Sequence, residues 1–264
     1  MLSFRVTITS RQNPLVARFR EAARGGADSP LLLDGAHLVA DAFASKVTLT
    51  TVAVTPAAVE RADLSPLFSD LTRAGIEITT VSSVVMAALS PVRTPSGIVA
   101  LAERPRPAGD RVYAGGLVVI AVGVQDPGNV GAIVRVAEAG SASGLVAAAG
   151  TADPLGWKAL RGSMGSALRL PIAFAADVEA TIANARRRGF RIVATVPRGG
   201  TSPAEADLSG DVALLIGGEG RGLDEALIEA AHERVTIPMA APVESLNAAV
   251  TAALLIYEAR RQNK

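Results

Sequence analysis

The sequence predicts an α/β protein of two domains, with a mostly parallel sheet in the C-terminal half and a smaller α/β domain before it. Three observations lead to this fold class. Short β-branched runs alternate with helical stretches along both halves of the 264-residue chain. In the second half these runs are continuously apolar, which is typical of strands covered on both faces. A stretch rich in proline, glycine and charge separates the two halves.

The first half of the chain alternates between helices and strands. A helix is expected at 13–24, where Leu15, Val16 and Phe19 share one face and Gly25 with Gly26 ends it. The other predicted elements are a strand at LLLDG, a helix at 36–45, a strand at 47–54, a helix near 57–75, a strand at IEITTV, a short helix at 83–89 and a closing turn and strand in TPSGIVALAE.

The stretch RPRPAGDRVYAGG, residues 104–116, is the best candidate for a linker. We place the boundary near residue 107, which divides the chain into domains 1–107 and 108–264. The second domain holds the clearest strand signals, the runs LVVIAV, GLVAAA, FRIVATV, VALLIG and RVTIP.

Composition limits the chemistry that the chain can perform. Cysteine is absent, which excludes disulfides, thiolate catalysis and cysteine-based metal sites, and His37 with His232 are too few for a zinc centre. No apolar run approaches the ~20 residues of a membrane span. The start of the chain, MLSFRVTITSRQNP, has no basic-then-apolar signal pattern, so we expect a cytoplasmic protein with no membrane partner.

Net charge is +1, which favours no partner by itself, but arginines gather near the start of the chain. Arginine pairs bidentately with phosphate and stacks on bases, so a nucleic-acid-facing patch is one hypothesis. A solvated helix face explains the same residues equally well. The candidates are Arg11, Arg18, Arg20 and Arg24.

Three segments follow strands of the second domain, at the end of the sheet where open α/β proteins bind ligands. The first is QDPGNVGAIVRVAEAG. A turn at 126–128 places Asn129 at the start of a helix that runs to about Ala139 and carries Arg135. Taken singly, Asn129 is explained as a helix cap and Arg135 as a solvated helix residue.

The second segment is LLIGGEGRGLDEAL. Several glycines around one carboxylate indicate a backbone that approaches something closely or adopts positive φ. No G-x-G-x-x-G register fits and no Walker lysine follows, so an NAD or ATP site is disfavoured. A glycine-rich turn with Asp224 capping the next helix remains the alternative.

The third segment is VTIPMAAPVESLNAAVTAALLIYEARR, in which IPM ends a strand and Ser245 is expected to cap a final helix. Asn247 is a polar exception in the first turn. The helical stripe of Leu246, Val250, Ala253, Leu254 and Tyr257 is expected to be core.

In this order the three segments resemble the motifs of the SpoU (TrmH-like) family of SPOUT methyltransferases. The first motif is Asn129 followed six residues later by Arg135, the second is the run from Gly217 to Leu223, and the third is IPM with Ser-Leu-Asn at 245–247. Upstream, SRQNPLVARFREA, LLLDGAHLVADA and LSPVRTPSGIVA look like the family's substrate-binding domain, which has a ribosomal-protein-L30-like (L30e-like) fold. The chain departs from the family pattern at Asp34 and Ser96, which bears on which RNA is recognised.

The resemblance implies a trefoil-knotted SPOUT topology, a rare feature that periodicity cannot reveal. It also implies S-adenosylmethionine as cofactor, held in the knot loops largely by backbone groups. The cofactor-binding residues that it implies are Thr195, Gly217, Gly218, Gly220, Ile237, Met239 and Leu246.

The implied reaction is methyl transfer to a ribose 2′-hydroxyl in RNA, with no metal. The family assigns Arg135 to this hydroxyl, sometimes as the base. A guanidinium stays protonated, with a pKa above about 12, so we favour phosphate binding and stabilisation of the forming alkoxide. Asn129, Ser245 and Asn247 would position the nucleophile and the loop, and Glu219 would brace the glycine-rich turn or Arg135.

The resemblance further implies a homodimer that pairs through the catalytic half, and an RNA partner. The N-terminal domain favours ribosomal RNA, most of all 23S ribosomal RNA. The alternatives are a tRNA 2′-O-methyltransferase and a catalytically silent RNA-binding protein of the same fold. A housekeeping role and an antibiotic-resistance role both stay open.

Overall fold

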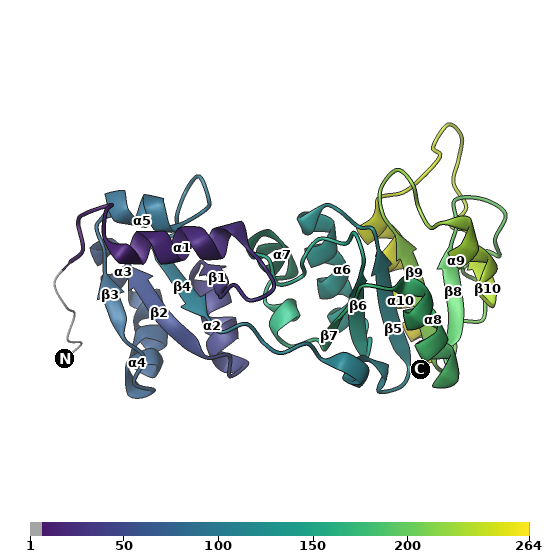
Figure 1. Cartoon of the computed structure of the whole chain (residues 1–264), viewed down its shortest axis with the longest axis horizontal. Helices are drawn as coiled ribbons and strands as arrows, with labels where there is room; N and C mark the ends of the chain where they lie inside the picture. The colour runs from purple at the N-terminus through teal and green to yellow at the C-terminus, as the bar shows by residue number, and fades with distance from the viewer. Residues whose placement is uncertain (1–6, 264) are drawn as a thin grey trace. The chain divides into compact units, whose positions relative to one another are not determined.

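The structure of the protein, a computed structural model, describes residues 7–263 (Figure 1). The chain divides into two compact units. The first contains the described residues up to Pro105 together with Leu155–Leu168, and the second contains Arg106–Pro154 and the chain from Arg169 onward. Sequence patterns gave no indication that a segment of the second half belongs by its contacts to the first unit.

The first unit is built on a four-stranded mixed sheet of order β1-β4-β2-β3. Strand β4 pairs antiparallel with β1 and β2, whereas β2 and β3 run parallel. The elements are α1 (Pro14–Arg24), β1 (Leu31–Asp34), α2 (Ala36–Ala44), β2 (Leu49–Val54), α3 (Pro56–Val59), η1 (Ala62–Leu64), α4 (Ser65–Arg73), β3 (Ile78–Thr80), α5 (Ser83–Leu89), β4 (Ile98–Ala102), α7 (Trp157–Ser163) and η3 (Ser166–Leu168).

Helix α1 begins and ends as its sequence predicts. The side chain of Asn13 caps it by accepting a hydrogen bond from the backbone N–H of Leu15 at 2.9 Å, and Pro14 occupies the first turn, where no N–H is needed. Val16 and Phe19 are buried in the core of this unit. The helix thereby covers the sheet and leaves its arginines in solvent.

The prediction of one continuous helix near 57–75 is wrong. The structure divides it into α3, η1 and α4. The break lies at Arg61, whose backbone is extended, with φ −72° and ψ 119°. Arg61 also pairs with Asp63 across the break, with Nη2 2.5 Å from Oδ2. The helical spacing of apolar residues continues through this segment, so the spacing alone did not reveal the break at Arg61.

Helix α7 completes the first unit although it comes from the second half of the chain. It contacts β1, and Trp157 packs against the same core as α1. The turn after it is close-fitting, because a Cβ at Gly165 would lie 2.2 Å from Oδ2 of Asp41. The first unit therefore depends on residues far beyond its linker.

The second unit has a six-stranded sheet of order β10-β8-β9-β5-β6-β7, with every pair parallel. This confirms the mostly parallel sheet. The elements are η2 (Gly109–Tyr113), β5 (Leu117–Val122), α6 (Pro127–Ala139), β6 (Gly144–Ala148), β7 (Ile172–Ala175), α8 (Val178–Arg187), β8 (Arg191–Thr195), β9 (Val212–Gly217), α9 (Glu225–Glu229), β10 (Glu233–Val235) and α10 (Ala248–Gln262). The edge strand β7 was missed, because its four residues include the exposed Phe174 and give little signal.

Helices cover both faces of this sheet, which explains the continuously apolar strands. On one face Val118 and Ile120 of β5 pack in a single cluster with Ile182 of α8 and Leu227 of α9. On the other face α10 packs against α6 and β9 (Figure 1). Within residues 7–263 no helix is both long and apolar enough to cross a bilayer.

The prediction that the stripe of Val250, Leu254 and Tyr257 on α10 lies in the core is wrong. Val250, Leu254 and Tyr257 are 47%, 48% and 52% exposed. The opposite stripe is buried, and α6 selects it: a Cβ at Gly140 would lie 2.1 Å from Cγ2 of Ile256. Apolar residues surround much of this helix, so periodicity cannot say which face meets α6. The buried residues are Ala248, Ala252, Leu255, Ile256 and Ala259.

Candidate active site

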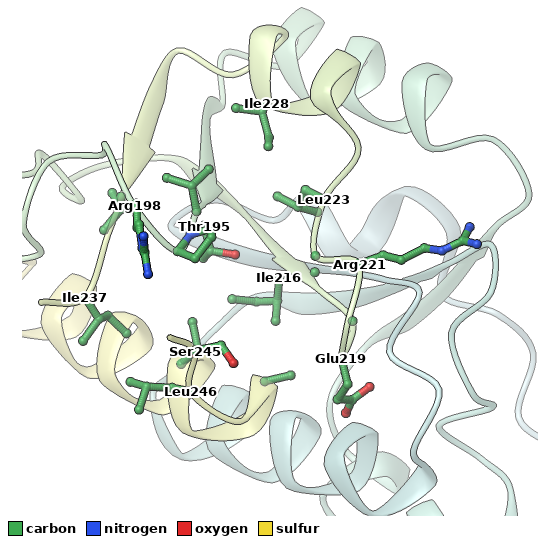
Figure 2. Close-up of a pocket in the computed structure, with 18 of the residues that line it drawn as sticks. Thr195, Arg198, Ile216, Glu219, Arg221, Leu223, Ile228, Ile237, Ser245 and Leu246 are labelled. Carbon is green, nitrogen blue, oxygen red and sulfur yellow. The ribbon is translucent and has the colours of Figure 1, made fainter. Parts of the chain in front are cut away.

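A cavity of about 700 Å³ opens at the carboxyl ends of β8, β9 and β10 (Figure 2). Its walls come from the loops after these strands and from the start of α10. The position agrees with the rule for ligand sites in open parallel sheets. All the residues for which the resemblance implied cofactor binding lie around this one cavity: Thr195, Gly217, Gly218, Gly220, Ile237, Met239 and Leu246.

The loop after β9 folds back on itself at the floor of the cavity. Gly218 and Gly222 form a bridge, with the N–H of Gly222 donating to the carbonyl of Gly218 at 3.2 Å. A Cβ at Gly218 would lie 1.9 Å from the carbonyl oxygen of Gly123, and Gly220 has φ +92°. The prediction that this backbone approaches something closely and takes positive φ is confirmed. The close neighbour is the backbone after β5.

A chain of side-chain hydrogen bonds joins the three sequence motifs. Nδ2 of Asn129 donates to Oε1 of Glu219, and Nδ2 of Asn247 donates to Oδ1 of Asn129 at 2.9 Å. Oδ1 of Asn247 accepts from the backbone N–H groups of Ala249 at 2.9 Å and Val250 at 3.3 Å. Because a carboxylate only accepts and a helix N-terminus only donates, each amide in the chain has one allowed orientation.

Two predicted helix caps are wrong. Asp126, rather than Asn129, caps α6, and its Oδ1 accepts from the N–H of Asn129 at 2.9 Å. Asn247, rather than Ser245, caps α10. Ser245 lies in the wall of the cavity instead. Asn129 is thus in the first turn of its helix with its side chain free to link the other two motifs.

Glu219, in the glycine-rich turn, accepts a hydrogen bond from Asn129 and makes no hydrogen bond or ion pair with Arg135. Arg135 is exposed on α6 and does not line the cavity. It stands six residues beyond Asn129, about 9 Å further along the helix axis at 1.5 Å per residue. Within one chain, therefore, the structure does not bring Arg135 to the cavity.

The cavity has an apolar wall and a charged rim. Figure 2 shows Ile216, Ile237 and Leu246 around it. The hydroxyl of Thr195 donates to the carbonyl of Leu215 at 2.9 Å, so Thr195 fixes the end of β8. Several lining residues, above all Arg198, were not expected from the sequence. The rule that ligands bind beyond strand ends, applied to the loop after β8, would have found it.

The arginines proposed for nucleic-acid binding are exposed in the first unit but do not form one stripe. Arg20 and Arg24 are four residues apart on α1 and share a side. Arg18 lies on the other side of the buried face and lines a shallow pocket with Asn13 and Thr79. Arg11 precedes the helix. These positions are compatible with either hypothesis for the patch.

Two titratable groups with shifted pKa values have structural explanations. Burial raises the pKa of Asp34, whose Oδ2 accepts from the hydroxyl of Ser90 at 2.5 Å. Desolvation lowers the pKa of His232, and its Nδ1 accepts from the N–H of Ile192 at 2.8 Å. Neither lines the cavity. Among residues 7–263 no three His, Cys, Asp or Glu side chains gather to form a metal-binding group.

Solved structures define the class to which this fold and site belong. The crystal structure of an AdoMet-bound rRNA methyltransferase from Sinorhizobium meliloti matches 98% of this chain and 98% of its own, with a TM-score of 0.84 and 30% identity. The protein is an S-adenosylmethionine-dependent RNA 2′-O-methyltransferase by class, with a SPOUT-type α/β catalytic half.

The particular family follows from the sequence models. Residues 116–257 match the SpoU rRNA Methylase family, and residues 26–100 match the MRM3-like substrate binding domain. The chain belongs to the SpoU rRNA methylase family, as its motifs predicted. An uncharacterized tRNA/rRNA methyltransferase of Synechocystis sp. is 33% identical over 97% of this chain and 94% of its own length. The 23S rRNA (guanosine(2553)-2′-O)-methyltransferase RlmP of Bacillus subtilis is 31% identical over 87% of this chain and 88% of its own.

Proposed function

We propose that this protein transfers a methyl group from S-adenosylmethionine to a ribose 2′-hydroxyl of 23S ribosomal RNA. The hydrogen-bonded chain from Glu219 through Asn129 to Asn247 supports this most directly, because it unites the three motifs of the family at one cavity. We assign residues 108–264 to catalysis and residues 1–107 to recognition of the RNA.

The cavity suits the proposed cofactor. Its volume of about 700 Å³ lies within the ~300–1,000 Å³ of ordinary small-molecule sites. Ile216, Ile237 and Leu246 offer an apolar wall to the adenine ring, and the loop from Gly217 offers backbone groups without side chains. When bound, S-adenosylmethionine supplies an electrophilic methyl group on a sulfonium.

The residues of this chain would orient the RNA and the cofactor loops. Asn129 and Asn247 hold the starts of α6 and α10 together, and Glu219 ties the loop after β9 to them. Ser245, in the cavity wall, would contact the ribose. Arg135 would bind the adjacent phosphate and stabilise the forming alkoxide, which requires that it reach the cavity of another chain.

A homodimer would supply that arrangement, and α10 offers the surface for it. Val250, Leu254 and Tyr257 form a large apolar stripe that is about half exposed, on a helix that packs against the Arg135-bearing α6. We expect Leu254→Glu with Tyr257→Glu to give a monomer in sedimentation experiments. Val84→Glu, at an apolar residue 58% exposed in the other unit, is the control. A wild-type monomer at micromolar concentration would contradict the dimer.

Mixed dimers test where Arg135 acts. A chain with Arg135→Ala is combined with a chain whose cavity is blocked by Leu246→Glu. If Arg135 serves the partner's cavity, the mixture recovers activity that neither variant has alone, because one site per dimer is then intact. No recovery, with mixed dimers demonstrated, would place Arg135 elsewhere.

The substrate is tested by mapping 2′-O-methyl groups in total RNA from cells with and without the gene. We expect one 23S ribosomal RNA nucleotide to lose its modification. The RlmP relative and the match to a substrate binding domain support this target. Loss of a tRNA modification instead would favour the alternative substrate, and no loss at all would favour a silent RNA-binding protein.

We propose that the arginines of α1 belong to the RNA-binding face. Charge reversal of Arg18 and Arg20 should weaken RNA binding and flatten its salt dependence, because fewer counterions are released. Reversal of Arg61 and Arg73, two exposed arginines of the same unit, is the charge-matched control. If both pairs behave alike, α1 has only a solvated face.

Two further proposals concern topology and location. After β10, at the edge of the sheet, the chain returns to pack α10 against α6 and β9, and we propose that this return makes a trefoil knot. An experimental structure traced through residues 236–247 tests it. We also propose a cytoplasmic location, in line with the ribosomal RNA relatives, which fractionation with ribosomes would test.

A further inference from the structure

Arg198 projects from the loop after β8 into the wall of the cavity. Figure 2 shows its guanidinium directed toward the side where Ile237 and Ser245 lie. Its partner is Glu244, on the loop after β10, with Nη2 3.7 Å from Oε1. The two side chains are 78% and 83% exposed. Such a long, exposed ion pair contributes little to stability, so it does not hold the loops together.

Two other charged groups of the wall, Glu219 and Arg221, are engaged or directed elsewhere. Glu219 accepts from Asn129. In Figure 2 the side chain of Arg221 extends away from the cavity. Of these two arginines, both in loops beyond strand ends, only Arg198 therefore presents its fork to a ligand. Its weak contact with Glu244 is one that an incoming anion can replace.

We propose that Arg198 recognises the carboxylate of the amino-acid part of S-adenosylmethionine, and that Glu244 occupies the guanidinium when the cofactor is absent. This rests on the proposed function. A guanidinium matches a carboxylate with two parallel hydrogen bonds. The apolar wall of Ile216 and Leu246 favours the adenine, so the charged tail is directed to the exposed rim, where Arg198 and Glu244 lie.

The exchange of partners has a consequence for affinity. Glu244 competes with the ligand carboxylate for the same guanidinium, so its removal should tighten binding. The competition is mild, since exposed pairs of this kind are worth a factor of about 1.5 to 5 in an equilibrium. Arg198 itself should be worth roughly 10- to 100-fold, the range of a hydrogen bond to a charged group.

The experiment compares two ligands by calorimetry on the full chain. S-adenosylhomocysteine carries the carboxylate, and 5′-methylthioadenosine has the same adenosine without the amino-acid part. Arg198→Ala should weaken S-adenosylhomocysteine roughly 10- to 100-fold and leave 5′-methylthioadenosine within about twofold. Glu244→Gln should tighten only the former. Arg221→Ala is the matched control and should change neither.

The outcomes separate this inference from the proposed function. If the folded wild-type protein binds neither ligand, the proposed function fails. If Arg198→Ala weakens both ligands equally, or neither, Arg198 does not recognise the carboxylate and the inference is overturned. Loss of RNA binding with both ligand affinities unchanged also overturns it, and identifies Arg198 as a phosphate contact. Thermal melts of the variants confirm folding, which this exposed position should not disturb.

Discussion

Asn247 performs two tasks that a pair of substitutions can separate. Its Oδ1 caps α10, and its Nδ2 donates to Asn129. Asn247→Ala removes both, whereas Asn247→Asp keeps an acceptor for the helix N–H groups and loses the donor. With aspartate at this position, Asn129 faces acceptors on both sides, because Glu219 also only accepts. The amide of Asn129 presents its nitrogen to Glu219 and its oxygen to position 247, so in either orientation one of the two acceptors meets an oxygen and receives no hydrogen bond.

The expected magnitudes differ accordingly. Loss of an N-cap costs about 1 kcal/mol, so Asn247→Ala should lower the Tm by roughly 2–4 °C for a unit of this size. Asn247→Asp should leave the Tm nearly unchanged, since aspartate caps as well as asparagine and suits the positive end of the helix dipole. Both should reduce turnover by on the order of 10²-fold, because the starts of α6 and α10 lose their fixed spacing at the cavity.

The assay combines thermal unfolding with methyl transfer from labelled S-adenosylmethionine. Asn13, which caps α1 in the other unit, is the stability control, and Asn13→Asp and Asn13→Ala should differ in Tm as the Asn247 pair does. Wild-type turnover in Asn247→Asp would refute the importance of the hydrogen-bonded chain. A Tm loss equal to that of the alanine variant would refute the separation of its two tasks.

Three other predictions concern the charged residues and the units. Arg135→Ala should leave cofactor affinity intact and reduce turnover roughly 10²–10³-fold, and Arg135→Lys should recover little at neutral pH; a steep rise toward alkaline pH would instead support a role as base. Burial raises the pKa of Asp34, so its ionisation destabilises the folded state as pH rises through and above the ordinary carboxyl range. Asp34→Asn should therefore raise the free energy of unfolding at pH 7, and this gain should vanish near pH 3. Denaturant titrations at the two pH values check it. The fragment 108–264 should bind the cofactor, but α7 loses the core that covers it, so the fragment should expose apolar surface to a hydrophobic dye. A version with residues 155–168 replaced by a short glycine-serine loop should bind the cofactor without binding the dye.

The structure changes how one obvious variant should be interpreted. Gly217→Val would be expected from sequence to crowd the cofactor. A Cβ at Gly217, however, would lie 2.6 Å from the backbone carbon of Gly222. The substitution therefore disturbs the loop itself, so lost binding would not report on the cavity. Leu246, whose side chain lines the wall, is the better probe.

The sequence by itself determined the fold class of the catalytic half, the family and two of the segments that line the cavity. Parallel strands with both faces covered leave continuous apolar runs, and a loop that must pass another backbone within van der Waals distance leaves glycines, as at Gly218. These features depend on residues close together in the chain, so local patterns record them. The sequence also identified Asn129 and Asn247 as polar exceptions at helix starts.

Only the tertiary structure decided what those exceptions do. The partners of Asn129 are 90 and 118 residues away, so no local pattern states which asparagine caps a helix and which connects to the other. The same holds for the buried face of α10, which α6 selects from a helix with apolar residues on more than one side, and for α7, which joins the first unit through contacts with β1. Arg135 lies outside its own cavity for a related reason: helix geometry turns it away from Asn129, and only packing between elements or chains can bring it to a ligand.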